Sequence, residues 1–406
     1  QEPPAAQKGT ERDIINLWSK VYKERGWDQF ATFNKKGGFN RPYVIFKAKN
    51  ITDPEMRQKK WDSARPIAPG TKHPMRKLLG LVGRAWYFAV ANWKAEHFVI
   101  QQTDQVPNFL REAEALKERG ELEYVIRDIE GCFPNMPKRA IRQGLKHIAQ
   151  EVGKANQAEG VWVPKYNSSK PCKWKTRAQG HVFLPFEIMI SVMEFALENA
   201  ILEIGPGELI RQKSGIPMGD PISPAMTIGA LAYMEDRWMK QAVEPREKRH
   251  FKACRYMDDI LMFYAKNEKI WDHKLFLDMF GSCYNDPLKL EHGGDDTFLE
   301  TTFELCNNGQ VRFWLKNQNA GGERKIWRYQ DYRSYASVEQ KRATLVACLK
   351  KVQKMASDSW AVEKSAWDKI REFAELRYPS RMLRSICNYL GASTRERAWF
   401  KVRDAI

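Results

Sequence analysis

Two adjacent carboxylates set between two apolar runs constrain this chain more than any other feature. The segment KACRYMDDILMFY occupies residues 252–264, with Asp258 and Asp259 near its centre. Each apolar run suits a buried strand, so the pattern predicts a tight β-hairpin with the two aspartates at its bend. Burying two like charges costs several kcal/mol, on the order of 2–7 for a polar group without a partner, unless something neutralises them. A divalent cation would do so.

A third carboxylate ends another apolar run. Asp128 lies in YVIRDIEG, residues 124–131, which is typical of a buried strand that ends in a turn. Two strands that bring carboxylates to one sheet edge supply the hard oxygen ligands that Mg²⁺ prefers. Two such ions can activate an attacking 3′-oxygen and stabilise a leaving pyrophosphate. A paired aspartate alone is more often a surface or helix-capping feature, and here the context favours a metal site.

The remaining pattern indicates an α+β fold, because helical and strand-like segments alternate irregularly. A helix is expected to open the fold near residues 13–26, a short strand at 43–46 and a loop over 153–180. Further helices are expected over 76–101, from Pro137 onward, over 183–204 and 224–243, and through most of the last 75 residues.

The charge is concentrated in two blocks. The chain of 406 residues carries 67 Lys and Arg against 50 Asp and Glu, a formal net charge of +17. Residues 35–85 hold 13 basic and 3 acidic side chains, and residues 331–406 hold 16 and 9. Such blocks are typical of a surface that binds nucleic acid. Scattered cysteines and the lack of a long apolar run favour an intracellular protein with no membrane partner.

Three motifs in order resemble those of reverse transcriptases. RYMDDILMF resembles their metal-binding hairpin, and DIEGCFPNMP, residues 128–137, resembles their first catalytic strand and turn. Between them, QKSGIPMGDPISP, residues 212–224, resembles the segment that supports template and primer nucleotides. Upstream, KKWDSARPI, residues 59–67, is similar to the basic fingers segment.

Within the reverse transcriptases, the closest resemblance is to the Penelope-like group, which is related to telomerase. It rests on the D-x-x-x-x-F-x-N-x-P pattern from Asp128, on ALAYMED at 230–236 and on FLETTFEL at 298–305, and it covers about residues 40–385. The chain departs from the pattern with Asp220 where Ser is usual and Met257 where Val is common.

The resemblance implies a right-hand polymerase. We expect an N-terminal extension and helix at 1–29, fingers at 30–100, and a palm at 101–324 with an antiparallel, ferredoxin-like sheet. A loop insertion falls near 153–182 of the palm, and a helical thumb occupies 325–406. The activity implied is RNA-directed DNA synthesis by two-metal nucleotidyl transfer.

The same resemblance implies roles for individual residues. Asp128, Asp258 and Asp259 would bind two Mg²⁺ ions, for which Mn²⁺ can substitute, and Ile129 would add its backbone carbonyl. Lys60 and Arg65 would hold the triphosphate, as basic side chains on a hairpin can.

Further residues are expected around the nucleotide. The Phe133 ring would exclude a 2′-hydroxyl and so select dNTPs, and Lys289 would protonate the leaving pyrophosphate as general acid. The nascent base pair would meet a polar and glycine-rich set: Gln212, Gly215, Pro217, Met218 and Gly219.

Two other functions remain open at this stage. An RNA-dependent RNA polymerase of the same palm family shares most of the motifs, although Phe133 speaks against it. A catalytically dispensable RNA-binding scaffold derived from a reverse transcriptase is the alternative outside enzymes. The expected partners are an RNA template, a DNA or RNA primer and dNTPs, with a separate nuclease or RNA partner left open.

Overall fold

The computed structural model describes residues 10–46, 64–166, 170–175, 179–267, 271–294, 296–317 and 328–406, without the side chains of residues 46 and 64–66. The chain forms two compact units. Unit 1 comprises Gln1–Val99, Ile129–Val243 and Asp278–Leu290, and unit 2 comprises Ile100–Asp128, Glu244–Leu277 and Glu291–Ile406. Both units contain helices and strands, which confirms the mixed fold class.

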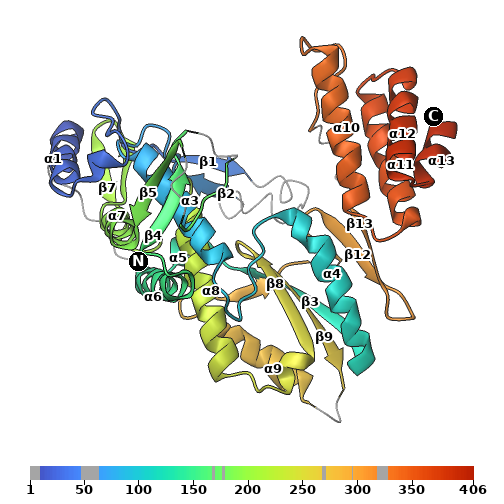
Figure 1. Ribbon diagram of the computed structural model, residues 1–406, viewed down its shortest axis with the longest axis horizontal. Helices are drawn as coiled ribbons and strands as arrows, with labels where there is room; N and C mark the ends of the chain where they lie inside the picture. The colour runs from blue at the N-terminus through green and yellow to red at the C-terminus, as the bar shows by residue number, and fades with distance from the viewer. Residues whose placement is uncertain are drawn as a thin grey trace. The chain divides into compact units, whose positions relative to one another are not determined.

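Unit 1 is mainly helical, with three small antiparallel ribbons (Figure 1). Its helices are α1 (Glu11–Glu24), η1 (Trp27–Gln29), α3 (Arg76–Ala91), α5 (Cys132–Asn135), α6 (Lys138–Asn156), α7 (Phe186–Glu198), α8 (Ser223–Gln241) and η6 (Gly281–Cys283). The ribbons pair β1 (Tyr43–Phe46) with β2 (Ala64–Ile67), β4 (Gly160–Pro164) with β5 (His181–Pro185), and β6 (Ile201–Gly205) with β7 (Glu208–Arg211).

Helix α8 forms the centre of unit 1, because it is buried on nearly all sides. Small residues let α6 approach it closely. A methyl group added at Gly144 would lie 3.2 Å from the Gly229 carbonyl oxygen and 3.3 Å from the Ala230 Cα. A glycine in mid-helix costs about 1 kcal/mol in propensity relative to alanine, and the close packing of two helices offsets that cost.

Unit 2 contains a four-stranded sheet in the order β10-β3-β9-β8. These strands are β3 (Glu121–Ile129), β8 (Phe251–Tyr256), β9 (Asp259–Lys266) and β10 (Leu290–His292), so β3 and β10 extend by a residue into unit 1. Strand β9 lies between β3 and β8 and pairs antiparallel with both. Its six central residues are all buried, as an apolar run in a central strand predicts.

One face of this sheet packs on helix α4 (Val106–Glu114), which lies beside β3 in Figure 1. The core there joins Leu110 of α4 to Ile126, Leu261 and Phe263 of the sheet. It continues into a three-stranded sheet of β11 (Thr297–Phe298), β12 (Thr301–Leu305) and β13 (Val311–Leu315). The central strands are therefore fixed by packing as well as by hydrogen bonds. Short elements complete this part: η3 (Thr103–Gln105), η4 (Ala115–Arg119), η5 (Glu247–Arg249) and α9 (His273–Phe280), which crosses into unit 1.

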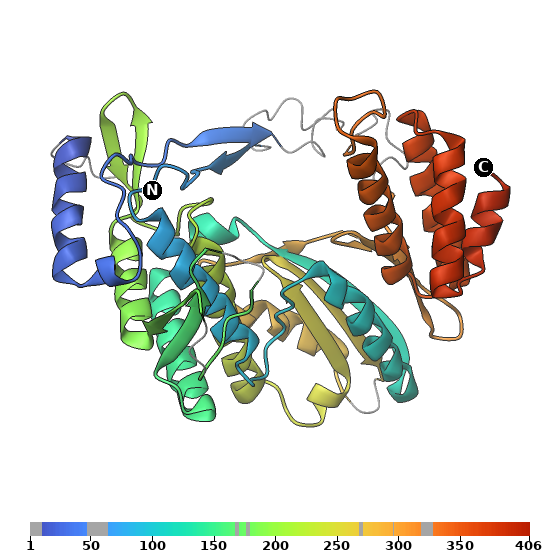
Figure 2. The ribbon, with the colours of Figure 1, turned by 45° about the horizontal axis from the view of Figure 1, so that its top comes forward.

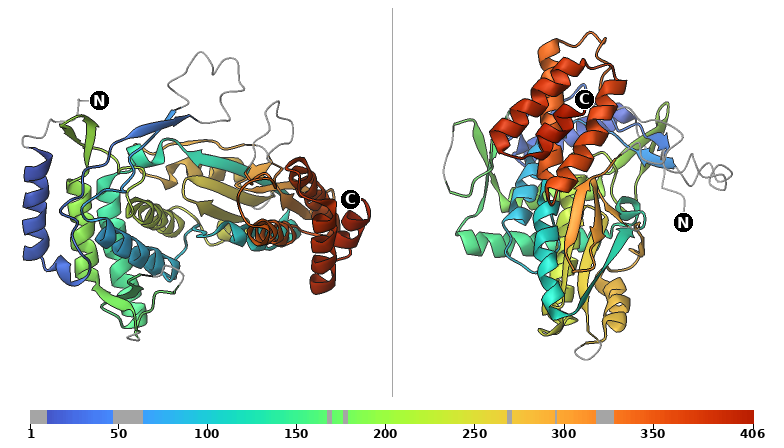
Figure 3. Two further views of the ribbon diagram at one scale, coloured as in Figure 1. Left: turned by 90° about the horizontal axis from the view of Figure 1, so that it is seen from above. Right: turned by 90° about the vertical axis from the view of Figure 1, so that its right-hand side faces the viewer.

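The C-terminal part of unit 2 is a helical bundle with its own core (Figure 2). It contains α10 (Val338–Lys354), α11 (Ser359–Glu375), α12 (Ser380–Thr394) and α13 (Ala398–Asp404). Ser337 and Asp358 cap α10 and α11 by accepting hydrogen bonds from backbone amides. Figure 3 shows the four helices from two further directions.

Most expected elements are present, with three differences. The helix expected over 76–101 ends at Ala91, the last residue of α3. Residues 183–204 were expected to form one helix, yet β5 ends at Pro185 and β6 begins at Ile201, so only Phe186–Glu198 is helical. The expected loop over 153–180 contains β4, whose partner β5 follows the loop. Apolar runs do not distinguish a buried helix from strand, helix and strand in series. Within the described ranges, no helix has the length and hydrophobicity that crossing a bilayer requires.

Candidate functional site

The register of the unit 2 sheet brings two of the predicted carboxylates face to face. Asp128 of β3 pairs directly with Asp259 of β9. Residues opposite each other on antiparallel strands place their side chains on the same face of the sheet, with Cβ atoms about 4.5–5.5 Å apart. Both side chains are half-buried. Residues 131 positions apart in sequence thus meet at one end of one sheet.

Asp258 lies in the two-residue turn between β8 and β9, next to this pair. Tyr256 pairs with Asp259, so Met257 and Asp258 alone form the turn of what we call the aspartate hairpin, residues 251–266. Met257 has a φ of 58°, a left-handed conformation that costs a non-glycine residue roughly 1–2 kcal/mol. Two-residue hairpin turns require such a conformation, because it matches the twist of the strands.

A buried arginine supports this turn. The Arg255 Nη1 atom donates a hydrogen bond of 2.7 Å to the Met257 carbonyl oxygen, and the Arg255 side chain is fully buried. A cation so deeply buried requires polar partners. Arg255 therefore holds the turn that carries Asp258.

The aspartates suit a hard cation by their chemistry. Carboxylate oxygens are the donors that Mg²⁺ prefers, and the backbone carries three of them to one sheet end. Across the described residues, however, no group of three or more His, Cys, Asp or Glu side chains is arranged to hold a metal ion. The backbone therefore brings the three aspartates to one sheet end, while their side chains do not surround a common point.

A second set of predicted residues lies together in unit 1, around what we call the glycine loop, residues 212–220. Gly131 follows β3 with a φ of 54° and begins the short helix that contains the half-buried Phe133. The Ile216 amide donates to the Phe133 carbonyl oxygen at 3.0 Å. Gly215 has a φ of 66°, and a side chain there would collide with the Phe133 and Pro134 carbonyl oxygens. Only glycine fits this position without displacing the Phe133 turn.

The other end of the glycine loop is bound to the segment that follows β2. The Ala68 amide donates to the Met218 carbonyl oxygen at 2.7 Å, and the Gly70 amide donates to the Gly219 carbonyl oxygen at 3.1 Å. Arg65 lies on β2, opposite Ile45 of β1, three residues before Ala68. The structure therefore brings the Arg65 strand, the glycine loop and Phe133 into one connected part of unit 1. Lys60 lies outside the described residues.

The first residue of the glycine loop is held by a lysine that the sequence analysis did not single out. The Lys138 Nζ atom donates to the carbonyl oxygens of Gln212 and Leu197 at 2.9 and 2.8 Å. The Gln212 amide in turn donates to the Ala200 carbonyl oxygen at 2.8 Å. Burial is the main reason that the pKa of Lys138 is lowered. Within the glycine loop, Pro217 is buried and Met218 is half-buried.

Two further residues predicted for the site are Ile129, which follows Asp128, and Lys289, which precedes β10. Ile129 ends β3 with its side chain in the core, so only its backbone is available to a ligand. The Lys289 carbonyl oxygen accepts a hydrogen bond of 2.9 Å from the Glu130 amide, and the Lys289 side chain is exposed. The backbone of Lys289 is thus fixed beside the residue that follows Ile129.

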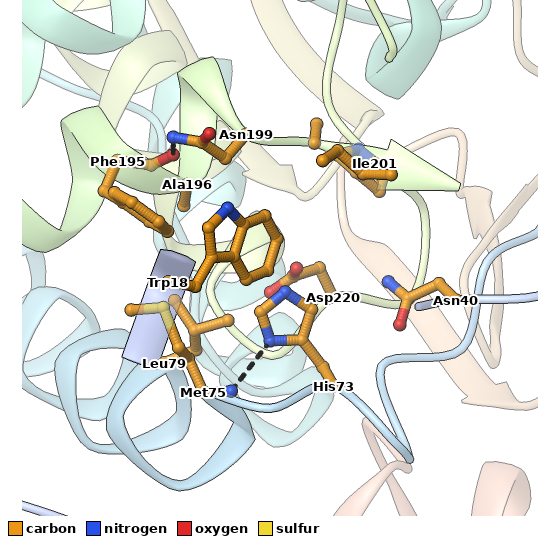
Figure 4. A pocket seen from close by; sticks show the side chains of 12 residues that line it. Trp18, Asn40, His73, Met75, Leu79, Phe195, Ala196, Asn199, Ile201 and Asp220 are labelled. Atoms are coloured by element: carbon orange, nitrogen blue, oxygen red, sulfur yellow. Dashed lines mark hydrogen bonds between the residues drawn. The ribbon is translucent and has the colours of Figure 1, made fainter. Parts of the chain in front are cut away.

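Beneath the glycine loop lies a closed pocket of about 10 Å³, close to the least volume that holds one water molecule (Figure 4). Figure 4 shows the His73 ring beside the Asp220 carboxylate and the Trp18 indole. The His73 Nδ1 atom accepts from the Met75 amide at 3.1 Å, and Asp220 accepts from the Ile222 amide at 3.2 Å. Burial lowers the pKa of His73 and raises the pKa of Asp220, and each group partly opposes the shift of the other.

The pocket explains in part why residue 220 is Asp, where the resembling motif usually has Ser. Asp220 ends the glycine loop as a buried acid beside a buried histidine, so the two residues join the loop to the segment that begins α3. His73 could not be found from the sequence, because a lone histidine in a basic segment carries no spacing signal. The contacts of Arg255 and Lys138 with backbone carbonyl groups were equally hidden, since they form only in the folded chain.

Comparison with known proteins identifies the class of fold. No protein-family model matches this chain, and no curated protein does. Among solved structures, the telomerase of Candida albicans in complex with the TWJ fragment of telomeric RNA matches with a TM-score of 0.54 at 11% identity, covering 96% of this chain and 65% of that one. Telomerase of Candida tropicalis with the same RNA fragment matches with a TM-score of 0.49 at 12% identity, covering 94% and 59%. A Sicinivirus RNA-dependent RNA polymerase matches with a TM-score of 0.39 at 9% identity, covering 69% and 52%.

The chain therefore has a polymerase fold of the reverse-transcriptase kind, like that of the Candida albicans telomerase. It spans 54 to 65% of the length of the telomerase chains that it matches. At this level of identity the likeness concerns the fold alone, and the activity is argued from the residues.

Proposed function

We propose that this chain is an RNA-directed DNA polymerase of the Penelope-like group, which extends a DNA or RNA primer on an RNA template. The observation that carries the proposal is the pairing of Asp128 with Asp259, with Asp258 in the adjoining turn. Acids brought together at one sheet end would supply the cation ligands that two-metal nucleotidyl transfer requires.

In this proposal, the three aspartates and the Ile129 carbonyl oxygen hold two Mg²⁺ ions, with Mn²⁺ as a substitute. When bound, the ions lower the charge of the reacting phosphates and favour the 3′-oxyanion of the primer. The sheet register sets the positions of Asp128 and Asp259, and the adjoining turn sets that of Asp258. Arg255 keeps the turn in its left-handed conformation through the Met257 carbonyl group.

The residues of unit 1 bind the nucleotide. Lys60 and Arg65 hold the triphosphate with charge-assisted hydrogen bonds. The glycine loop, with Gln212, Gly215, Pro217, Met218 and Gly219, supports the nascent base pair, because its backbone can approach closely where side chains are absent. Lys289 donates a proton to the leaving pyrophosphate.

The Phe133 ring selects the sugar. It falls five residues after Asp128, in the helical turn that follows Gly131. Its carbonyl oxygen is bound by the Ile216 amide, which limits how far the ring can withdraw from the glycine loop. A bulky ring under the sugar excludes a 2′-hydroxyl, whereas a polar residue would hydrogen-bond it. The expected consequence is a preference for dNTPs that the Phe133→Ala variant loses.

The proposed division of the chain follows from the same resemblance. The fingers occupy 30–100, the palm 101–324 and the helical thumb 325–406, after an N-terminal extension and helix at 1–29. The thumb agrees with the separate core of α10–α13, although this core also takes in Trp314 and Leu315 of β13.

Primer extension with four substrate combinations tests the proposal. The wild-type chain is offered RNA or DNA templates, each with dNTPs or NTPs, in Mg²⁺ or Mn²⁺. Extension on RNA with dNTPs is expected. Preferential use of NTPs would favour the RNA-dependent RNA polymerase, and template binding without extension under any condition would favour the RNA-binding scaffold.

A further inference from the structure

Basic side chains of unit 1 gather in a groove of about 1020 Å³ beside α3. We call it the α3 groove. Its walls come from the segment 28–34 after α1, from residues 71–84 in and before α3, and from Lys165 and Tyr166, the two residues that follow β4. None of the three aspartates and none of the residues of the glycine loop lines it.

The groove is strongly cationic. Arg76, Lys77, Arg84 and Lys165 line it, against one acid, Asp28. Within the part of the chain that the structure describes, none of these four cations forms an ion pair with a carboxylate. Uncompensated cations gathered on one concave surface raise the local concentration of an anion and favour its binding.

The polar contacts of these cations leave their charge available. Arg76 and Lys77 donate to the Thr71 carbonyl oxygen and the Thr32 hydroxyl at 3.2 and 3.1 Å, and both side chains are exposed. Arg84 donates to the Pro164 carbonyl oxygen at 2.8 Å, yet its buried Nε atom finds no hydrogen-bond partner among the residues that the structure describes. Burial lowers the pKa of Arg84. A nearby anion would offset that desolvation.

Aromatic side chains stand among the cations. Phe30 and Phe33 line one wall and are half-buried, and Tyr166 lines another and is 95% exposed. A tyrosine so exposed contributes little to the core. Cations interleaved with aromatic rings suit a single-stranded nucleic acid, because its phosphates pair with the former and its unstacked bases stack on the latter.

We propose that the α3 groove binds a single-stranded segment of the RNA template that lies outside the base-paired region. The assignment to template RNA rests on the proposed function, while the binding of single-stranded RNA rests on the groove. An enclosed, mostly apolar site would suit a small cofactor, whereas this one is open and lined by charge.

Fluorescence anisotropy with a labelled single-stranded RNA of about 20 nucleotides tests the proposal. The test variants are Arg76→Ala with Lys77→Ala, and Tyr166→Ala. The matched control is Lys20→Ala with Lys154→Ala, which also removes two exposed charges of unit 1 but lies outside the groove. Thermal unfolding of each variant establishes that the fold is retained.

The groove variant with two charges removed is expected to bind the RNA about tenfold more weakly. Its logarithmic salt dependence should be shallower by roughly 1.4, since each lost phosphate contact on a single strand accounts for about 0.7. Tyr166→Ala should weaken binding with little change in salt dependence, because a stacked base is worth roughly 1–3 kcal/mol and carries no counterion term. The control should bind as the wild type does.

Equal RNA binding by the Arg76→Ala, Lys77→Ala variant and by the control would overturn the proposal. The proposal would also be overturned if this variant lost as much affinity for an acidic peptide of the same charge as for the RNA. The assay reads binding without catalysis, so a wild-type chain that fails to extend any primer would contradict the proposed polymerase and leave the groove assignment intact. If extension occurs, the variant should lose activity on templates with a long single-stranded overhang and keep it on templates without one.

Discussion

The aspartate hairpin and the glycine loop are held in place by different means. In the hairpin, a buried side chain, Arg255, supports the turn, and the sheet register sets the positions of Asp128 and Asp259. In the glycine loop, backbone amides and carbonyl groups make most of the contacts, the Lys138 side chain holds the first residue, and Gly215 leaves no space for a side chain. Changing one carboxylate in the hairpin should therefore alter chemistry with little effect on folding, whereas changes in the loop should alter both.

The largest effect is expected when a carboxylate of the opposed pair is neutralised. Asp128→Asn keeps the size of the side chain and the strand pairing, while it removes a charge that the cation requires. Loss of groups that only orient a metal ligand costs about 10- to 100-fold, so loss of a ligand should cost more than about 100-fold in extension rate. Single-nucleotide addition measures the rate, and an unchanged melting temperature confirms the fold. A variant within a few-fold of the wild type would show that the opposed pair does not form the metal site.

A smaller loss should follow when the support of the hairpin is removed. Arg255→Met keeps apolar packing but leaves the Met257 carbonyl group without its donor, which costs about 1–3 kcal/mol in stability. Extension should fall about 10- to 100-fold, because Asp258 is no longer fixed. Lys252→Met, on the same strand, removes an exposed cation paired with Glu112 and serves as the control. If both variants lost the same amount, Arg255 would have no special role in the turn.

The sequence predicts the strands and turn of the aspartate hairpin better than it predicts Arg255, the residue that supports the turn. The apolar runs around Asp258 and Asp259 predict both strands and the bend, because period and burial are local properties. The partner of Asp259 could be named only from the order of motifs, since strand pairing over 130 residues is not local. The roles of Arg255, Lys138 and His73 depend on backbone groups and neighbours that meet only in the folded chain.

In the glycine loop, stability and activity should fall together. Gly215→Ala places a Cβ atom against the Phe133 and Pro134 carbonyl oxygens in addition to the left-handed cost of roughly 1–2 kcal/mol. Gly207→Ala is the matched control, because Gly207 has a φ of 76° and nothing lies within 4 Å of the added carbon. Denaturant unfolding should show a larger loss for Gly215→Ala than for Gly207→Ala. Equal losses would mean that the loop yields to a side chain.

The smallest effect concerns pH and the pocket under the glycine loop. The pKa of His73 is lowered from 6.5 by burial, so the unfolded chain takes up a proton near pH 6.5 that the folded chain refuses, and stability falls as pH decreases below that value. Asp220 has a raised pKa and acts in the opposite direction, because the folded chain takes up its proton first as pH falls.

Removing Asp220 should therefore leave the destabilising effect of His73 at low pH unopposed. Asp220→Asn should lose stability below pH 6.5 more steeply than the wild type, and the double variant with His73→Gln should show a flatter profile. Urea unfolding between pH 5 and pH 8 measures this. A profile of Asp220→Asn that is no steeper than that of the double variant would contradict the roles given to this pair.

The most direct test of the polymerase assignment is single-nucleotide addition to a primer on an RNA template, with one dNTP and Mg²⁺, by the wild type and by Asp258→Asn. Asp258 lies in the turn rather than in a strand, so its replacement leaves the sheet pairing intact. One added nucleotide is expected with the wild type and none with Asp258→Asn, with equal affinity of both for the primer and template. Retained addition by Asp258→Asn, or its loss together with template binding, would contradict the assignment.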